Sequence, residues 1–579
     1  MKMKKIIILL TLTVVWTTFY SCDEYLDVEN PNSTVTNSDP QNLLFAAYAE
    51  LQDEDVLGIA FESLRSDVGR IGPLVTSNAN DFPYTTFYNQ DISNPAIDER
   101  LEGKWNAHYK GILQANVTLD RLNQLEEENG SLTEVQEYQK AQARCLRGMY
   151  HFFLHSVFNE GKIIIQDAPV VLNTAFKSLS TSQEVIDFFR ADLEYAFENL
   201  FEAEDTANGF VSKGFAATLL GKSYLYEGNY TQAIQWLTNP SIQGQYSLLS
   251  GNAAVNMFSE SQEFSNESIF ELAYNVNDLT GESILGNTTN HVTRETAPPT
   301  AVRFRRPTLR VNDISGGGQG VSYLTPPYWL TIAYTSEEID PTDNRNTVNG
   351  ELRPVSLRTS AMIAVPQDII TEYYERDFAA LAVFFGRGYA SFYKKYTNHD
   401  IIDQEIPGNN NRELRSGKNI MVARYAEVVL MLAECYIEEN MLPEAVTEIE
   451  SIRSRWGLRS LTDIGVDVNS QEALRNHLRF VEKPLELSAE GFSIRAIDLR
   501  RWGIGSARYA DLQARSYNFT EFTFEVPDGQ TAPTPQIDNL IVEDPSGDFI
   551  DYDGISYDTT NNGWLPLPQQ ERTLNNNID

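Results

Sequence analysis

Apolar side chains recur about every 3.6 residues in three stretches of the chain, which is the spacing of one face of an α-helix. The stretches cover 113–125, 137–158 and 184–200. Ser182 stands just before the apolar positions of the third stretch, as is typical of a residue that caps the start of a helix. This pattern predicts a mainly α-helical protein.

Two further segments share one order of residues. Each has a leucine, then a small residue, then a tyrosine four positions after the leucine and an alanine thirteen positions after it: Leu220, Gly221, Tyr224 and Ala233 in one, and Leu432, Ala433, Tyr436 and Ala445 in the other. This spacing resembles the tetratricopeptide repeat (TPR), a pair of antiparallel helices that approach closely at small residues. Turns are expected at Gly228-Asn229 and Glu439-Asn440. We predict a scaffold of TPR-like helical hairpins, in which these two distant copies do not form a continuous solenoid.

Three stretches lack long periodic runs and are rich in Gly, Pro, Asn, Asp and aromatic residues. They cover 60–104, 240–420 and 510–579. We expect long loops with short β-strands that decorate the helical scaffold. Loops of that length in a compact protein are usually functional, so a binding site is expected among them.

The chain begins like an exported protein. Lys2, Lys4 and Lys5 precede a short apolar run that is too short to span a bilayer, and Ser21-Cys22 ends the segment. Phe19 to Cys22 resembles the lipobox of bacterial lipoproteins, which predicts a lipoprotein signal peptide at 1–21, lipid attachment at Cys22 and an acidic tether at 22–40. The alternative is an ordinary signal peptide cut near Ser21.

Composition narrows the function. The chain has 579 residues, 42% of them apolar, which is enough for a large core, and we expect two intertwined lobes. Its formal net charge of −36 argues against nucleic acid, whose binding depends on cationic contacts to phosphate. Apart from Cys22 only Cys145 and Cys435 remain, and two buried free thiols are favoured over a disulfide.

Four motifs follow one another in a recognisable order. They are Tyr25-Leu26-Asp27, then Arg424, Glu427, Ala433 and Glu434, then Glu486-Leu487, Glu490-Gly491 and 498–503, and finally Pro566-Leu567-Pro568 with Glu571. In this order they resemble the opening, the RxxEVxLxxAE helix, the ELxxEGxRxxDLxRWG signature and the closing motif of the SusD/RagB family of outer-membrane nutrient-binding lipoproteins. Ser493 stands where the signature has Arg, and the family's final residues are missing.

The resemblance implies a SusD-like α/α superhelix, with an N-terminal region at 41–260 and a C-terminal region at 261–579 that holds a TPR-like pair near 420–457. It also implies a lipid-anchored protein on the outside of the outer membrane. Such a protein captures polysaccharide or oligosaccharide for a SusC-like TonB-dependent transporter and is not an enzyme. The alternatives are peptide or glycoconjugate binding by the same scaffold, a glycoside hydrolase, or a periplasmic TPR scaffold.

Some residues invite a chemical interpretation. Glu482, Glu486 and Glu490 follow one another at helical spacing, but with arginines nearby they favour a structural ion-pair network over an acid–base pair. His151 and His155 have zinc-compatible spacing, yet core histidines among aromatic rings are favoured. Calcium is possible at Asp548, Asp551 and Asp553, without a full motif, and we expect no cofactor or metal.

A sugar site needs flat apolar faces beside planar hydrogen-bonding groups. Two loop stretches, 65–105 and 303–329, supply both, and the resemblance places ligand residues in the same broad regions. The candidate ligand-binding residues are Asn78, Asn80, Phe82, Tyr84, Tyr88, Arg305, Tyr323, Tyr328 and Trp329. Five arginines at 294–310 would suit an anionic glycan. Pairing with the protein's own carboxylates or with the transporter is favoured, so a neutral glycan is the weak preference.

Overall fold

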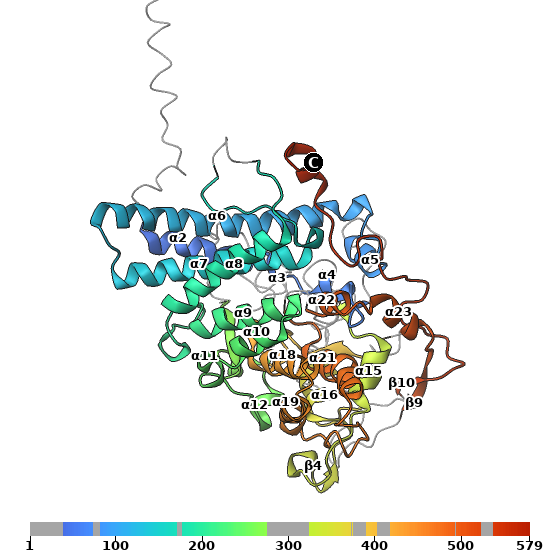
Figure 1. The fold of residues 1–579 in the computed structure, drawn as a ribbon. Helices are drawn as coiled ribbons and strands as arrows, with labels where there is room; N and C mark the ends of the chain where they lie inside the picture. The colour runs from blue at the N-terminus through green and yellow to red at the C-terminus, as the bar shows by residue number, and fades with distance from the viewer. Residues whose placement is uncertain are drawn as a thin grey trace, which may run out of the picture.

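The computed structural model describes residues 39–72, 82–170, 176–274, 324–371, 373, 389–401, 417–491, 494–522 and 537–578. The predicted signal peptide at 1–21 and nearly all of the tether at 22–40 lie outside these residues, as does Cys22. In the described part of the chain, helices form the frame and strands are short (Figure 1). The predicted fold class, a mainly α scaffold with short strands, is confirmed.

Long helices of the N-terminal region lie together along one side of the molecule (Figure 1). They are α2 (Pro40–Ala49), α6 (Asp98–Asn129), α7 (Glu134–Val157) and α8 (Ser182–Asn199). The three periodic stretches correspond to α6, α7 and α8, but α6 begins at Asp98, well before the start that the pattern indicated. Leu101 and Trp105 are buried, so these first turns of α6 pack against the core. The α8 cap is Thr181, one residue before the expected Ser182.

The two TPR-like hairpins are present where the spacing predicted them. One is α9 (Lys213–Glu227) with α10 (Tyr230–Leu237), and the other is α18 (Tyr425–Glu438) with α19 (Leu442–Arg455). Gly228 ends α9 with φ of 81°, a left-handed conformation that glycine adopts without steric cost. A Cβ at Gly221 would lie 2.6 Å from the Leu237 side chain, so the missing side chain lets α9 and α10 approach.

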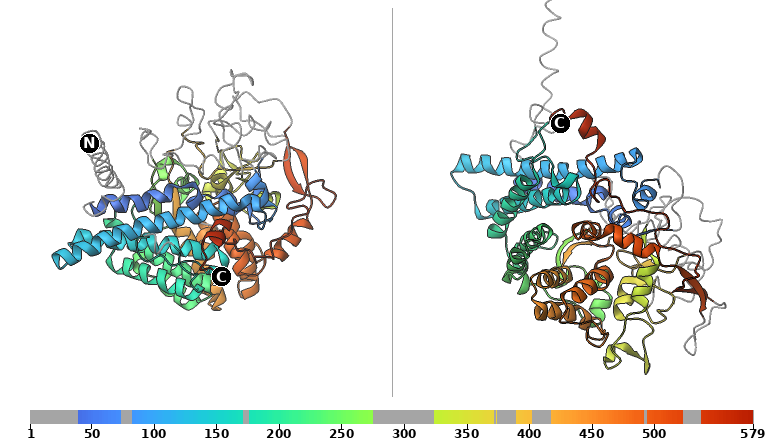
Figure 2. Two further views of the ribbon diagram at one scale, coloured as in Figure 1. Left: turned by 90° about the horizontal axis from the view of Figure 1, so that it is seen from above. Right: turned by 45° about the vertical axis from the view of Figure 1, so that its right-hand side comes forward.

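The two hairpins lie side by side although they are distant in sequence. Helix α10 packs on α18, and the Thr231 hydroxyl donates a hydrogen bond of 2.9 Å to Glu439. The right-hand view of Figure 2 shows the green helices of the first hairpin beside the orange helices of the second. This packing joins the two halves of the chain into one scaffold, and the buried apolar residues of both halves form one continuous cluster.

Shorter helices cover the rest of the scaffold. They are α3 (Glu54–Leu57), α4 (Ala60–Leu64), α5 (Phe82–Tyr88), α11 (Pro240–Gln243), α12 (Gly251–Val255), α15 (Tyr328–Thr335), α16 (Leu357–Met362), α20 (Gln471–His477), α21 (Lys483–Leu487), α22 (Ile494–Arg501), α23 (Gly505–Gln513) and α24 (Gln569–Leu574). Helices α4, α5 and the start of α6 fall within 60–104, so the prediction of a loop there was wrong. Burial of one helical face outweighed the Gly- and Asn-rich composition.

The described strands pair two at a time and antiparallel. The pairs are β1 (Arg70–Ile71) with β3 (Leu324–Thr325), β2 (Ser268–Leu272) with β8 (Ile420–Arg424), β4 (Thr347–Val348) with β5 (Glu351–Leu352), β6 (Ile363–Ala364) with β7 (Phe392–Tyr393), and β9 (Tyr517–Phe522) with β10 (Ile537–Glu543). Two of these pairs, β1 with β3 and β2 with β8, join distant parts of the sequence, so they fasten irregular segments to the scaffold.

Cys145 and Cys435 are buried free thiols, as predicted. Burial raises the pKa of both thiols, which keeps them protonated. In the described part of the chain, no helix combines the length and the apolar character that a bilayer crossing needs.

The contact at Gly221 gives a test of the hairpin packing. We expect Gly221→Ala to lower the free energy of unfolding by about 1–2 kcal/mol, because crowding against Leu237 outweighs the better helix propensity of Ala. Urea unfolding curves would measure it. In the double variant with Leu237→Ala the two losses should not add, because the smaller residue makes room. Strict additivity would contradict the close approach.

Candidate functional site

The two stretches predicted to bind ligand meet in the structure. Strand β1 pairs with β3, so that Arg70 lies opposite Thr325 and Ile71 opposite Leu324. The Thr325 hydroxyl also donates to the Arg70 carbonyl at 3.1 Å. Segments that are far apart in the sequence therefore form one local surface.

Three half-buried side chains define what we call the ligand face: Arg70, Tyr88 and Tyr389. The Arg70 guanidinium lies 4.2 Å from the centre of the Tyr328 ring and 5.1 Å from that of Tyr389, which fixes its position by cation–π contact. Tyr88 lies beside Tyr552, with ring centres 5.5 Å apart. The face thus offers aromatic surface next to a planar hydrogen-bond donor.

Tyr328 and Trp329 are buried, with exposed fractions of 1% and 6%. The Tyr328 ring packs among Tyr517, Phe519 and Phe549, and the Trp329 indole N–H donates to the Asp67 carbonyl at 2.6 Å. Neither side chain offers a ring face to a ligand in this conformation. We therefore leave both out of the ligand face and assign them to its support.

Of the remaining candidates, the structure describes Tyr84 and Phe82 but not the others. Tyr84 is 7% exposed and stacks on Phe61 with ring centres 4.4 Å apart, so its ring is also occupied. Phe82 begins α5, which carries Tyr88. Asn78, Asn80, Arg305 and Tyr323 lie outside the described residues, as do the arginines at 294–310. A ligand role for those residues stays a prediction.

The support beneath the ligand face is a buried charge cluster. Asp67 accepts from Arg495 at 2.6 Å and from Arg508 at 2.7 Å. Burial acts to raise the pKa of Asp67, but the two guanidinium groups outweigh it and hold the pKa at about 2. The Tyr552 hydroxyl donates to the carbonyls of Ser66 and Gly69. These ion pairs and hydrogen bonds together fix the turn that leads into Arg70.

Asp551, one of the aspartates considered for calcium, holds the start of α15. Its two carboxylate oxygens accept the backbone N–H groups of Tyr328 and Trp329 at 3.0 and 2.8 Å. Burial raises the pKa of Asp551 to about 6, although these two hydrogen bonds act against the shift. Among the described residues, no group of three or more His, Cys, Asp and Glu side chains is placed to hold a metal.

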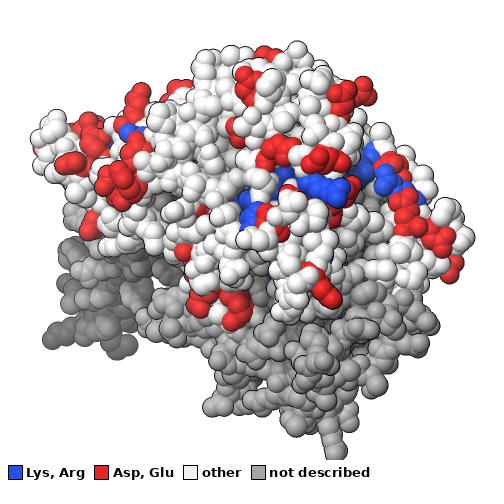
Figure 3. All heavy atoms as spheres, turned by 90° about the horizontal axis from the view of Figure 1, so that it is seen from below, with Lys and Arg blue, Asp and Glu red and all other residues white. Residues whose placement is uncertain are grey.

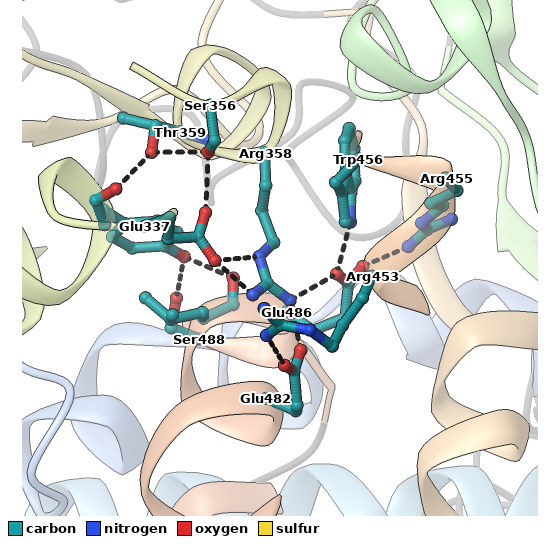
Figure 4. A network of polar contacts seen from close by, with 12 residues as sticks. Glu337, Ser356, Arg358, Thr359, Arg453, Arg455, Trp456, Glu482, Glu486 and Ser488 are labelled. Atoms are coloured by element: carbon teal, nitrogen blue, oxygen red, sulfur yellow. Dashed lines mark hydrogen bonds and ion pairs between the residues drawn. The ribbon is translucent and has the colours of Figure 1, made fainter. Parts of the chain in front are cut away.

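The signature carboxylates form a buried ion-pair network (Figure 4). Glu486 accepts from Arg424 and from the Trp456 indole N–H, each at 2.8 Å, and also pairs with Arg455. Glu482 accepts from Arg358 at 2.7 Å and from Arg453 at 2.6 Å, and the Glu490 carboxylate pairs with Arg424 and Lys395. The structural interpretation of these residues is confirmed.

Two carboxylates of the network, Glu482 and Glu486, are kept ionised. Burial acts to raise the pKa of Glu486, but Arg455, Arg424 and Arg358 outweigh it and hold the pKa at about 2. The pKa of Glu482 is also well below its ordinary value, for the same balance of burial against Arg358 and His477. A general acid must carry a proton near neutral pH, which neither group does.

The histidine interpretation is confirmed as well. The Nδ1 atom of His151 lies 2.9 Å from the Arg147 carbonyl and its ring packs on Phe188, whereas His155 lies against Phe189 and 2.8 Å from the Ser182 hydroxyl. The two rings thus have separate partners. Burial lowers the pKa of each to about 4, so both are neutral.

Tyr389 belongs to the ligand face but was not among the sequence candidates. It follows Gly386, Arg387 and Gly388 in the irregular middle region, and that setting was the available signal. What identifies it is its place beside Arg70, which depends on tertiary packing.

The helical scaffold with these signature residues is matched by two family models. The model described as "SusD family" covers residues 266–579, more than half of the chain, and the one described as "Starch-binding associating with outer membrane" covers 24–225. The chain belongs to the SusD family, which confirms the resemblance.

Individual relatives are distant. The chain is 22% identical to the SusD-like protein P25 of Formosa agariphila over 528 residues, which cover 86% of this chain and 90% of that one. A SusD-like protein of Bacteroides ovatus is 28% identical over 160 residues, so the match spans only 28% of its length. The solved structure of surface glycan-binding protein A from Bacteroides thetaiotaomicron in complex with laminarihexaose superposes with a TM-score of 0.63 at 18% identity, covering 93% of this chain and 97% of that one.

The network predicts a specific loss of stability. Glu486→Gln removes one of the two buried glutamates that Arg424 and Arg455 share, so we expect the free energy of unfolding at pH 7 to fall by about 3–5 kcal/mol. Glu194→Gln, at an exposed position of α8, is the matched control and should change little. Urea unfolding of the three proteins would measure the difference.

The pH dependence of the free energy of unfolding tests the same network. The folded-state pKa of Glu486 lies below its unfolded value, so its stabilisation is full above pH 4.5 and is lost as the pH falls toward about 2. The difference in free energy of unfolding between the wild type and the Glu486→Gln variant should therefore narrow on acidification. A difference that widens would contradict an ionised Glu486.

Proposed function

We propose that this protein is a cell-surface glycan-binding lipoprotein. It captures polysaccharide or oligosaccharide on the outside of the outer membrane and delivers it to a SusC-like TonB-dependent transporter. The observation that supports this most directly is the ligand face, where Arg70, Tyr88 and Tyr389 stand half-exposed on a buried, charge-paired support in a SusD-family chain. The structural neighbour that holds laminarihexaose supports a glycan as the ligand.

The chemistry of the ligand face suits a sugar. Pyranose rings carry apolar C–H faces that stack on aromatic rings, and their hydroxyls accept hydrogen bonds from planar donors. Tyr88 and Tyr389 supply the rings, and Arg70 supplies the donor. Because the Tyr328 ring holds the guanidinium in place, less conformational entropy is lost when a hydroxyl binds.

Charge favours a neutral glycan. On the face shown in Figure 3, carboxylates are spread over the surface, and the Lys and Arg side chains form a band that Asp and Glu border. Surface cations can be paired with carboxylates, as in the exposed pair of Arg459 and Glu338. With a net charge of −36, the protein repels a polyanion. At an ionic strength of about 0.1 M, salt screens this repulsion at distances beyond about 10 Å.

The proposed activity is binding without catalysis. The signature carboxylates were the best candidates for a hydrolytic pair, and Glu482 and Glu486 are fully buried and paired with arginines. A glycosidase needs one protonated and one ionised carboxyl beside the scissile bond. Neither Glu482 nor Glu486 is protonated near neutral pH, and neither is accessible to a substrate, which supports a carrier that leaves the glycan intact.

Replacement of Tyr389 tests the ligand face. We expect Tyr389→Ala to weaken retention in gels that contain laminarin, starch or galactomannan by about 1–3 kcal/mol, the scale of one aromatic stacking contact. Tyr230→Ala removes a half-buried ring on α10 and should leave retention unchanged. Equal migration of both variants and the wild type would exclude Tyr389 from the site. Release of reducing sugar by the wild type would contradict a function without catalysis.

Replacement of Cys22 tests the anchor. Lipid attachment at this residue requires its thiol, so Cys22→Ser should move the protein from the outer-membrane fraction to the soluble fraction. Protease treatment of intact cells should digest the wild type if it faces outward. A wild-type protein that is protected in intact cells, or that is soluble without the substitution, would contradict the proposed location.

A further inference from the structure

A second hollow lies outside the ligand face. Its volume is about 360 Å³, and three segments line it: 203–212 between α8 and α9, 244–246 after α11, and 264–271, which runs from a turn into β2. None of the residues of the ligand face is in its lining. The hollow is therefore separate from the ligand face, and its walls come from segments around α9 and β2 of the scaffold.

Phe264 is the unusual residue of this hollow. Its φ is 54°, in the left-handed region that a bulky side chain rarely adopts. The backbone N–H of Phe264 donates to the buried Glu271 carboxylate at 3.0 Å, which holds this conformation. Phe264 is half-buried and is one of the residues that line the hollow. Strained backbone that neighbouring groups maintain is common at ligand contacts.

The other walls provide a second ring and several amides. Phe210 lines the hollow and is fixed from behind by edge-to-face packing on Tyr48, with ring centres 5.2 Å apart. The amide side chains in the lining are those of Asn208, Gln245 and Asn266. Rings for C–H faces and planar polar groups for hydroxyls are the same pair of features that the ligand face combines.

The charge of the hollow selects against anions. The described lining includes Glu204 and the buried Glu271, whose pKa burial raises, and it contains no Lys or Arg. An anionic ligand would meet the carboxylate of Glu204 without a compensating cation in the lining, whereas a neutral hydroxyl-rich ligand can use this carboxylate and the amide oxygens as acceptors.

We propose that this hollow is a second binding site for neutral carbohydrate, with Phe264 as its stacking platform. The proposal rests on the glycan-binding function proposed above and extends it. A long polymer that engages the ligand face and the Phe264 site together gains avidity without new contacts at either site. Short oligosaccharides would occupy the two sites independently.

Affinity electrophoresis in gels containing laminarin, starch or galactomannan tests the proposal, with the chain from residue 23 onward. We expect both Phe264→Ala and Phe264→Leu to weaken retention about tenfold in the polymer that retains the wild type. The Leu variant keeps an apolar side chain at the strained position and removes only the flat ring. Phe176→Ala removes a ring of 52% exposure elsewhere and is the control. Melting temperatures verify that each variant is folded.

Hydrogen exchange locates the site independently of substitution. Oligosaccharides of the retained polymer should slow exchange at 203–212 and 264–271 in the wild type. If Tyr389→Ala weakens retention while both Phe264 variants migrate like the wild type, or if neither segment is protected, the second site is overturned and the ligand face stands. If no polysaccharide retains the wild type, the proposed function falls and the second site falls with it.

Discussion

Burial of ionised carboxylates together with arginines is the constraint on which this fold depends. Glu267 and Glu486 both accept from Arg424 and Arg455, so one network joins the entry to β2, the end of β8, the end of α19 and the middle of α21. Removing such charges from water is costly, and only a complete set of partners offsets the cost. The network therefore admits few alternative arrangements. Because β8 leads directly into α18, the same contacts orient the second TPR-like hairpin.

Buried carboxylates with a complete set of partners also support the ligand face. Asp67 is buried against Arg495 and Arg508, and Asp551 closes the N-terminus of α15. These groups hold the turn before β1 and the helix after β3, which are the two segments that meet at Arg70. A surface built in this way has little conformational freedom left to lose, so a ligand that binds there would cost little conformational entropy.

The helical frame was predictable because its determinants are local. Spacing of apolar residues located α7, α8 and both hairpins, and Gly221 marked a close helix contact that the structure shows. The first residues of α6, before Trp105, were missed because Leu101 is an isolated apolar position among charged residues. The ligand face was located only by region. Aromatic composition does not distinguish a buried Tyr328 from a half-exposed Tyr389, since burial depends on which distant segments pack against each ring.

Internal pairing also determines where the excess charge lies. The buried cations Arg358, Arg424, Arg453 and Arg455 neutralise interior glutamates and leave the surface acids unbalanced. In the described part of the chain, the excess negative charge is therefore carried mainly at the surface, where repulsion between like charges opposes association.

Arginine serves a different purpose at the ligand face. The Arg70 guanidinium lies over the rings of Tyr328 and Tyr389, and such stacking uses the flat face of the group. Its N–H donors point outward in the plane of the guanidinium, so ring contact and hydrogen bonding to a neutral hydroxyl are compatible. The interior arginines thus direct their charge and their donors at buried glutamates, whereas the charge of Arg70 meets ring faces and leaves the direction of its donors compatible with a neutral hydroxyl.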